Sequence, residues 1–415
     1  MFDAALLDQI RARFAHVDSC PFTGARIFFE NAGGALTLKS VVETTTRFAA
    51  IPDNQGRDNA ASHALVDVIT KSRADAMRFF NASEGAVLFG ESGTELLFRL
   101  IQDACLGAGP GIVLGSTVEH PASRSACTRW AEVSGRQYIQ VPHDDATGQV
   151  TPQAYAEHVT PDTAVATILH TSPVTGMAMD LPAIAAAIRA KAPNALIIVD
   201  GIQHACHGGI DVSAAGIDGY VISPYKVFSR HGYGIAWASD RLTALRHDAL
   251  TGAPAGQWEL GTRDTGAYAT FSDVVAYFDW LGGTLTTDTD PRARLTAAAK
   301  AIHAHEHALT QAMLRGIDNL PGLTDLPGVH IIGGADNPAR EGLVSFYSDS
   351  VPTAQIVAAL NDAGIRTHIR KADHYSGNIL TPLGQPDCVR VSLAHYNSPA
   401  EVRSFLSAVQ SILAE

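Results

Sequence analysis

The residues around Lys226 suggest that its amine could act as a nucleophile. Lys226 follows the apolar run GYVIS at 219–223 and precedes a glycine-punctuated loop, HGYG, at 231–234. Lysine is rarely buried without a partner, and an amine at the mouth of a sheet with few charged neighbours acquires the lowered pKa that makes it nucleophilic. A solvated surface lysine is the alternative interpretation.

A carboxylate stands at the end of another apolar run, ALIIVDG, in which Asp200 precedes Lys226 by 26 positions. Ligands of α/β proteins bind at the carboxyl ends of parallel strands, although a lone aspartate there is also a common cap. Together the two groups match the needs of pyridoxal phosphate. The amine forms a Schiff base, and the carboxylate keeps the pyridine nitrogen protonated so that the ring accepts electrons.

A phosphate cradle is predicted where the run AVLFG turns into a helix through Glu91, Ser92, Gly93 and Thr94. Backbone N–H groups and the helix dipole favour an anion at such a turn. Ser92 or Thr94 also has the residue type of a helix N-cap, and a cap and an anion site are compatible.

Alternating short apolar runs and longer periodic segments position these residues, and they predict an α/β fold with a mostly parallel sheet covered on both faces. The expected strands of the large domain are 27–29, 86–90, 111–115, 164–170, 195–201, 219–223 and 234–238. Four further strands are expected near 329–334, 343–348, 365–370 and 389–394. The predicted organisation is an N-terminal helical segment, 1–26, that packs with the small domain, a large domain, 27–290, a connecting helix, 291–320, and a small C-terminal domain, 321–415.

Composition excludes several partners. The chain has 415 residues with 30 Lys and Arg against 42 Asp and Glu, a formal net charge of −12. This balance disfavours nucleic acid and anionic membrane surfaces. The five cysteines are scattered and never spaced as CxxC, and the N-terminus lacks the basic start and apolar run of a signal peptide. We therefore expect a cytoplasmic protein that binds neither nucleic acid nor membranes.

One pattern resembles a metal site. His303 and His307 lie four positions apart with Glu306 beside them, so a helix places the two histidines on one face. No third ligand is evident in the sequence, and we expect no metal.

Several motifs occur in a characteristic order along almost the whole chain: FFENAGG, ESGTE, VEHPAS, ILHTSPVTG, VDGIQHACHGGIDV, ISPYKVF, LGTRDTG and VRVSLAHYN. In these motifs the chain resembles the class V pyridoxal-phosphate enzymes of fold type I, the group of cysteine desulfurases, selenocysteine lyases and kynureninases. The resemblance implies a large domain with a mostly parallel seven-stranded sheet, a small C-terminal α+β domain, and a homodimer with active sites at its interface.

The resemblance also implies roles for individual residues. Lys226 would hold the cofactor, Asp200 would pair with its pyridine nitrogen, and Gln203 would contact its phenolic oxygen. His120 would stack on the ring and take part in catalysis, although a histidine in an isolated VEHPAS loop has no such default role. The residues implied for the phosphate are Ser92, Gly93, Thr94, Ser223, Tyr225 and, from the neighbouring subunit, Thr262. Those implied for an amino-acid substrate are Arg390, which would clamp its carboxylate, Asn31 and Arg370.

Three departures from the family pattern bear on function. Pro173 stands where desulfurases usually carry asparagine, and Tyr225 replaces the usual histidine before the lysine. The segment that would carry the persulfide-forming cysteine, IRTHIRKADHYSGNIL at 365–380, contains no cysteine. A thiolate is the required nucleophile of desulfuration, so a sulfur-donor role is disfavoured.

The same segment carries a local basic cluster in an acidic protein: Arg366, His368, Arg370, Lys371 and His374. Such a cluster either binds an anionic group at the far end of a substrate or forms a solvated charged face. Both interpretations stay open in the sequence.

The expected activity is that of a β-eliminating lyase, such as a carbon–sulfur lyase, acting on an amino acid. The same cofactor chemistry also allows transamination, epimerisation and kynureninase-like carbon–carbon hydrolysis, because the outcome depends on which bond is broken and which acid is within reach. A cofactor-binding scaffold or regulator without activity is the non-enzyme alternative.

Overall fold

A computed structural model describes residues 1–254 and 256–414. Ala255 and Glu415, which fall in the predicted segments 27–290 and 321–415, lie outside the described residues.

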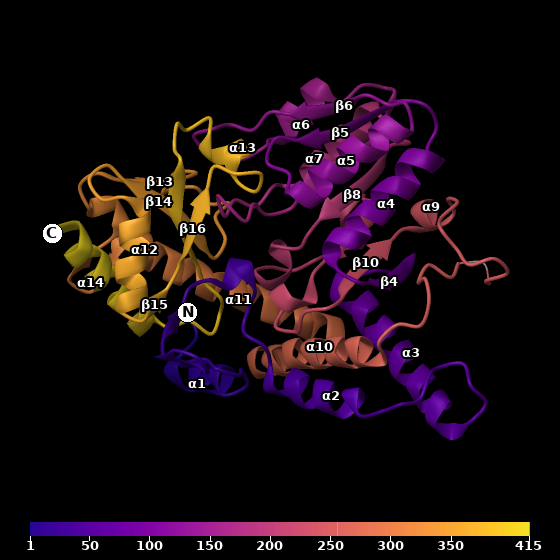
Figure 1. Cartoon of the computed structure of the whole chain (residues 1–415), viewed down its shortest axis with the longest axis horizontal. Helices are drawn as coiled ribbons and strands as arrows, with labels where there is room; N and C mark the ends of the chain where they lie inside the picture. The colour runs from indigo at the N-terminus through magenta and orange to yellow at the C-terminus, as the bar shows by residue number, and fades with distance from the viewer. Residues whose placement is uncertain (255, 415) are drawn as a thin grey trace.

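The large domain is built on a seven-stranded sheet (Figure 1). Its strands, in spatial order, are β4 (Ala86–Gly90), β10 (Gly234–Ala238), β9 (Gly219–Ile222), β8 (Leu196–Asp200), β7 (Thr163–Leu169), β5 (Ile112–Ser116) and β6 (Tyr138–Val141).

The sheet is parallel except at β10, which runs antiparallel to β4 and β9. The neighbouring strands β7, β8 and β9 are parallel, with Leu169 opposite Asp200 and Asp200 opposite Val221. Their carboxyl ends therefore meet at one edge. The predicted α/β fold with a mostly parallel seven-stranded sheet is confirmed.

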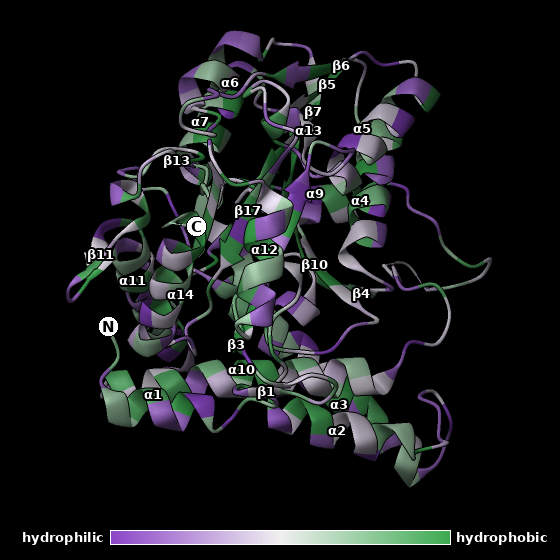
Figure 2. Ribbon diagram, turned by 60° about the vertical axis from the view of Figure 1, so that its left-hand side comes forward, coloured by the Kyte–Doolittle hydropathy of each residue, from purple (hydrophilic) through white to green (hydrophobic). Residues whose placement is uncertain are grey.

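Helices cover both faces of this sheet, and two separate clusters of apolar residues form its core. On one face, α4 (Gly93–Gly107) and α5 (Pro121–Val133) pack on alternate strand residues such as Val113 and Ile198. On the other, α7 (Leu181–Lys191) and α10 (Thr265–Leu285) cover residues such as Leu114 and Ile197. Burial on both faces explains why these strands are continuous apolar runs (Figure 2).

The remaining helices of the large domain lie around this core. α2 (Lys39–Ala49) and α3 (Ala60–Phe80) pack along α10 (Figure 1). The short helical segments are η1 (Asn31–Gly33), α6 (Pro152–His158), η2 (His204–Cys206), α8 (Val212–Ala215), η3 (Pro224–Lys226) and α9 (Asp240–Thr243).

One predicted strand lies elsewhere. Residues 27–29 do not join the large sheet, because β3 (Ile27–Phe28) pairs in parallel with β15 (Ile365–Arg366). The seventh strand of the large sheet is β6, which was not predicted. As an edge strand it is only partly buried and carries the exposed Gln140, so it lacks a continuous apolar run.

The C-terminal part forms a second sheet, in the order β13 (Val329–Ile331), β14 (Leu343–Ser348), β17 (Asp387–Ser392) and β16 (His368–Lys371). The helices α12 (Thr353–Asp362), α13 (Gly377–Leu380) and α14 (Pro399–Ala414) accompany it. The connecting helix α11 spans Pro291–Arg315 and is shorter than the predicted 291–320. Gly316, with φ of +100°, ends it and starts a small hairpin of β11 (Gly316–Ile317) and β12 (Leu320–Pro321), which η4 (Leu323–Asp325) follows.

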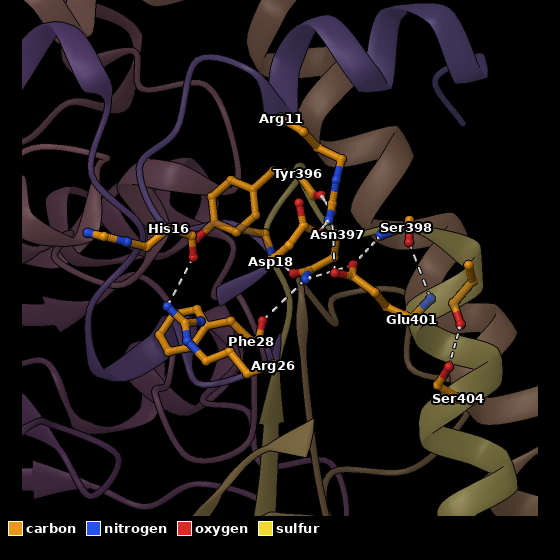
Figure 3. A network of polar contacts seen from close by, with 12 residues as sticks. Arg11, His16, Asp18, Arg26, Phe28, Tyr396, Asn397, Ser398, Glu401 and Ser404 are labelled. Atoms are coloured by element: carbon orange, nitrogen blue, oxygen red, sulfur yellow. Dashed lines mark hydrogen bonds and ion pairs between the residues drawn. The ribbon is translucent and has the colours of Figure 1, made fainter. Parts of the chain in front are cut away.

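The N-terminal segment contacts the C-terminal part of the chain (Figure 3). It contains α1 (Ala4–Arg11) and the two-stranded ribbon of β1 (Ser19–Cys20) and β2 (Gly24–Ala25). Arg11 donates hydrogen bonds to the backbone oxygen of Tyr396, at 2.6 Å, and to Glu401 on α14, at 3.3 Å. Among the described residues, no helix combines the length and apolar composition needed to cross a bilayer.

Candidate active site

A pocket lies at the edge where β7, β8 and β9 end, and it gathers most of the predicted cofactor residues. Its lining is Thr94, His120, Leu169, Pro173, Asp200, Ile202, Gln203, Ser223, Tyr225 and Lys226. Strand β8 delivers Asp200 and the turn into η2 delivers Gln203, whereas η3, directly after β9, delivers Lys226. Parallel strand order thus brings residues that are distant in sequence into one pocket.

Lys226 is buried, with 9% of its surface exposed. Its Nζ lies 3.2 Å from Oε1 of Gln203. Burial and the nearby charge of Arg390 lower the pKa of Lys226 from 10.5 to about 8, although Asp200 acts in the opposite direction. The amine is therefore available as a nucleophile or base near neutral pH. The surface-lysine alternative is wrong.

Asp200 is 2% exposed, and its carboxylate has few partners. Oδ1 accepts a hydrogen bond from the backbone N–H of Ile202 at 3.1 Å, and Oδ2 accepts one from Ser123 at 3.4 Å. Burial raises the pKa of Asp200 to about 6, which leaves it anionic at pH 7 to 8. A buried anion with so few partners is suited to a cationic ring nitrogen.

The turn at the start of α4 forms a cradle for an anion. Ser92 is the N-cap, and its Oγ accepts the N–H of Glu95 at 3.1 Å. The first N–H groups of a helix have no partner within the helix, and Thr94 in this turn lines the pocket. A Cβ added to Gly93 would collide with Oγ of Ser223 and with Ile202, so only glycine allows this close approach. The cap and the anion site are thus compatible here.

His120 caps the N-terminus of α5, where its Nδ1 accepts the backbone N–H of Ala122 at 3.2 Å. Burial, followed by the positive charges of Lys226, Arg370 and Arg124, lowers the pKa of His120 to about 3. The ring that lines the pocket is therefore neutral at physiological pH. A neutral flat ring is suited to stacking on an aromatic ligand.

Two arginines approach the pocket from the small domain. Arg390 on β17 is 3% exposed and donates to the backbone oxygen of Pro173 at 3.1 Å. Arg390 lies opposite His368 of β16, and side chains two positions apart on a strand point to the same face. Arg370 therefore lies on the same face of the sheet as Arg390. Both arginines lower the pKa of Lys226. In the part of the chain that the structure describes, the buried Nε atoms of both arginines have no hydrogen-bond partner.

Two predicted residues lie apart from this pocket. Asn31 is buried, and its amide is used within the chain, where Nδ2 donates to the backbone oxygen of Ser392 at 2.8 Å and Oδ1 accepts from Tyr396. Thr262 is exposed and lines a different depression, beside Arg263 and Asp264. Within one protomer neither side chain reaches the pocket lining.

The sequence reasoning missed Glu119. It is completely buried beside Asp200, and burial followed by the charge of Asp200 raises the pKa of Glu119 to about 8. Its carboxyl group is therefore mainly protonated at neutral pH and does not compete with Asp200 for a cation. Glu119 directly precedes His120 in the VEHPAS motif, and this position could have indicated that it lies near the site.

His303 and His307, the candidate metal ligands, lie on one face of α11, and their rings are stacked with centroids 6.4 Å apart. Glu306 is turned inward and buried, where it contacts His207 at 2.6 Å. Within residues 1–254 and 256–414, no group of three or more His, Cys, Asp or Glu side chains is arranged to hold a metal ion.

Comparisons with known proteins agree with this architecture. The model of the family "Aminotransferase class-V" matches residues 27–405. A probable cysteine desulfurase of Pseudomonas putida is 31% identical over 359 residues, covering 81% of each chain. The cysteine desulfurase-like protein ustD of Aspergillus flavus is 27% identical over 94% of this chain and 88% of its own. The crystal structure of the cysteine desulfurase CsdA of Escherichia coli superposes with a TM-score of 0.79 at 22% identity, covering 100% of this chain and 99% of that one.

The chain therefore belongs to the class-V aminotransferase family, and it has the fold type I architecture. Members of this family are pyridoxal-phosphate-dependent, and the chain is an enzyme of that kind. The pocket fits such a cofactor: it combines a buried amine, a buried carboxylate with few partners, a flat neutral ring and an anion cradle that a Cβ at Gly93 would fill.

The lowered pKa of Lys226 has a measurable consequence. Only the uncharged amine attacks an aldehyde, so the rate of pyridoxal-phosphate uptake by the cofactor-free protein should rise with pH and level off above about 8. Stopped-flow absorbance of the bound cofactor between about pH 6 and pH 11 measures this rate. A rate still climbing up to the ordinary lysine value of 10.5 would contradict the proposed environment of the amine.

Proposed function

We propose that this enzyme binds pyridoxal phosphate through Lys226 and catalyses β-elimination from an amino acid, with release of a keto acid and ammonia. The observation that carries the proposal is the buried amine of Lys226, with its lowered pKa, beside the buried carboxylate of Asp200. The bound cofactor supplies an electron sink for the carbanion at Cα. Asp200 holds the proton on the ring nitrogen, and Thr94 and Ser223, with the cradle at Gly93, bind the phosphate.

Lys226 is the group that moves the Cα proton. With a substrate bound, the free amine of Lys226 would accept that proton, for which its pKa of about 8 is well matched. The leaving group then departs from Cβ with the bonding electrons. Addition of one water completes the balance and gives the keto acid and ammonia.

The absence of a cysteine in segment 365–380 supports a lyase without a persulfide step. Cys206 and Cys388 lie in the sequence motifs that carry Gln203 and Arg390, and both are buried. Burial raises the pKa of Cys388 to about 12, which disfavours its thiolate. The sulfur or other leaving group would therefore be released directly and not carried on the enzyme.

The substrate class follows from the two arginines. Arg390 offers a guanidinium fork to the substrate carboxylate, and Arg370, on the same face of the sheet, supplies a second positive charge near the pocket. We therefore propose an amino acid whose side chain carries a second anionic group. The exposed Arg366, in contrast, is paired with Glu30 at 2.7 Å.

Replacing Arg370 with alanine should raise the KM for such a dianionic substrate by about 10- to 100-fold, the expected loss for a hydrogen bond to a charged group. The KM for an amino acid with a neutral side chain should change little. Steady-state kinetics on both substrates measures the difference, and Arg366→Ala is the matched control. An unchanged KM for the dianionic substrate would remove Arg370 from the substrate site.

The test of the reaction type is incubation of the purified holoenzyme with a panel of amino acids in the absence of a keto-acid acceptor. The panel contains cysteine, cysteine sulfinate, S-substituted cysteines, selenocysteine, aspartate and kynurenine. Release of keto acid and ammonia in amounts far above one equivalent supports β-elimination. If product stops at one equivalent while the cofactor accumulates in its amine form, the enzyme is a transaminase.

We also propose a homodimer in which Thr262 of one subunit completes the phosphate site of the other. The exposed position of Thr262 outside its own pocket supports this arrangement. A fully active monomer, found by mass measurement in solution, would contradict it.

Five unpaired cysteines support a reducing, cytoplasmic location, which fractionation of the source cells tests.

A further inference from the structure

A continuous chain of buried hydrogen bonds extends from Lys226 away from the pocket. Lys226 Nζ donates to Oε1 of Gln203 at 3.2 Å, and Nε2 of the same amide lies 3.2 Å from Nε2 of His207. Nδ1 of His207 lies 2.6 Å from Oε2 of Glu306. Gln203 is 3% exposed and the other two side chains are 1% exposed. The proposed reaction gives no role to His207 or Glu306.

This pair joins two parts of the fold. His207 follows η2 in the large domain, whereas Glu306 comes from the connecting helix α11. Gly342, next to β14, completes the close packing, because a Cβ there would lie 3.2 Å from Nδ1 of His207 and 3.0 Å from Oε2 of Glu306. The short contact and the tight packing fix the imidazole ring in one position.

The proton state of His207 decides which end of the Gln203 amide faces the pocket. A histidine with a proton on Nε2 donates to the amide oxygen, whereas a histidine without it accepts from the amide nitrogen. A half-turn of the amide exchanges its two ends and leaves both 3.2 Å spacings in place. His207 therefore selects whether Gln203 presents a donor or an acceptor to the pocket.

We propose that Glu306 keeps His207 protonated on both ring nitrogens, so that Nε2–H holds the Gln203 oxygen and the Gln203 N–H group faces the pocket. This inference rests on the proposed cofactor site, in which that N–H donates to the phenolic oxygen of pyridoxal phosphate. His207 and Glu306 are then positioning residues that act through Gln203. In the structure Lys226 donates to Oε1 of Gln203, and a half-turn of the amide brings the N–H group to the pocket in its place.

The charges around His207 favour this state. Burial opposes a charge on the ring of His207 and also raises the pKa of Glu306, but the direct contact of the two groups favours the charged pair and, with Cys206, holds the pKa of His207 well above its usual value. Glu341 faces the same cluster, and its carboxylate, whose pKa is held low by nearby histidines, also favours a cation. His395 also lies near His207, and burial keeps the pKa of His395 well below its usual value. His395 therefore adds no competing positive charge.

The test is a spectroscopic pH titration of the holoenzyme and of Glu306→Gln. A donor to the phenolic oxygen stabilises its anion and lowers the pH at which the visible absorption of the bound cofactor changes with protonation. Glutamine at position 306 retains the shape of the side chain but removes the charge that holds the second proton on His207. We expect this pH to rise by about one unit or more, with at least a several-fold weaker affinity for pyridoxal phosphate.

A neighbouring pair provides the matched control. His204 and Glu341 form an equally buried contact, at 2.7 Å between Nδ1 and Oε1, but the hydrogen bonds of His204 lead to Thr171 and Gly209 and not to Gln203. Glu341→Gln also removes a charge from this cluster, but it leaves the contacts of His207 with Glu306 and Gln203 in place, so it should lower the melting temperature and shift the spectral pH by clearly less than Glu306→Gln. If Glu306→Gln does not fold, His207→Phe removes the same donor and should give the same upward shift.

The outcomes separate this inference from the proposed function. A wild-type protein that develops no visible absorption with pyridoxal phosphate would overturn the cofactor site and the inference with it. A wild-type protein with a normal pH transition that Glu306→Gln or His207→Phe leaves unchanged would overturn the inference alone. In a Gln203→Leu background, which lacks the amide, Glu306→Gln should add no further shift, and an additional shift would contradict an action through Gln203.

Discussion

Replacing Lys226 with alanine is expected to abolish keto-acid release over many turnovers, with a loss of about four orders of magnitude or more in kcat. Lys226 is the one lysine among the described residues that line the pocket. Its buried amine both anchors the cofactor and moves the Cα proton in the proposed reaction. The variant should also lose the visible absorption of the bound cofactor. Both properties are measured on the same purified sample.

Lys300→Ala is the control for this experiment, because Lys300 is an exposed lysine on α11. It should have wild-type activity and absorption. If Lys226→Ala still turned over at a rate within tenfold of the wild type, the assignment of Lys226 would be wrong.

Replacing Asp200 with asparagine is expected to lower kcat by about two to three orders of magnitude, the usual effect of removing one preorganised electrostatic partner. The amide retains the size of the side chain but cannot hold a proton on the ring nitrogen, so the electron sink is weakened. The KM should change far less than kcat, because Asp200 does not contact the substrate in the proposed site. Steady-state kinetics with a β-eliminating substrate separates the two parameters.

Asp103→Asn is the matched control. Asp103 on α4 is also 2% exposed, and burial raises its pKa to about 7, but it lies outside the pocket lining. The same substitution there should leave kcat within about twofold. Equal losses in the two variants would attribute the effect of Asp200→Asn to general destabilisation.

The sequence was sufficient to predict site residues where the neighbouring residues already indicate the local structure. Asp200 ends one apolar run and Lys226 lies four residues after another, and parallel strands bring such ends to one edge of a sheet. Gly93 lies at a strand-to-helix turn, where the local chemistry of an anion site is readable. These residues could therefore be assigned to one pocket before the structure was known.

Other features depend on contacts that no local pattern contains. Residues 27–29 are as apolar as any core strand, but their partner is β15, more than 300 positions away. Asn31 lies in a family-like motif, and only the structure shows that its amide is held by Ser392 and Tyr396. Glu306 stands beside the histidine pair that resembles a metal site in the sequence, whereas in the structure it is buried and contacts His207.

Borohydride reduction of the enzyme loaded with pyridoxal phosphate, followed by peptide mapping, tests whether Lys226 holds the cofactor. Reduction fixes the cofactor to the amine that holds it. We predict one equivalent of label per chain, located on Lys226, and no label on the exposed Lys71 or Lys300. A labelled peptide that does not contain Lys226, or a protein that takes up no label, would show that Lys226 does not hold the cofactor.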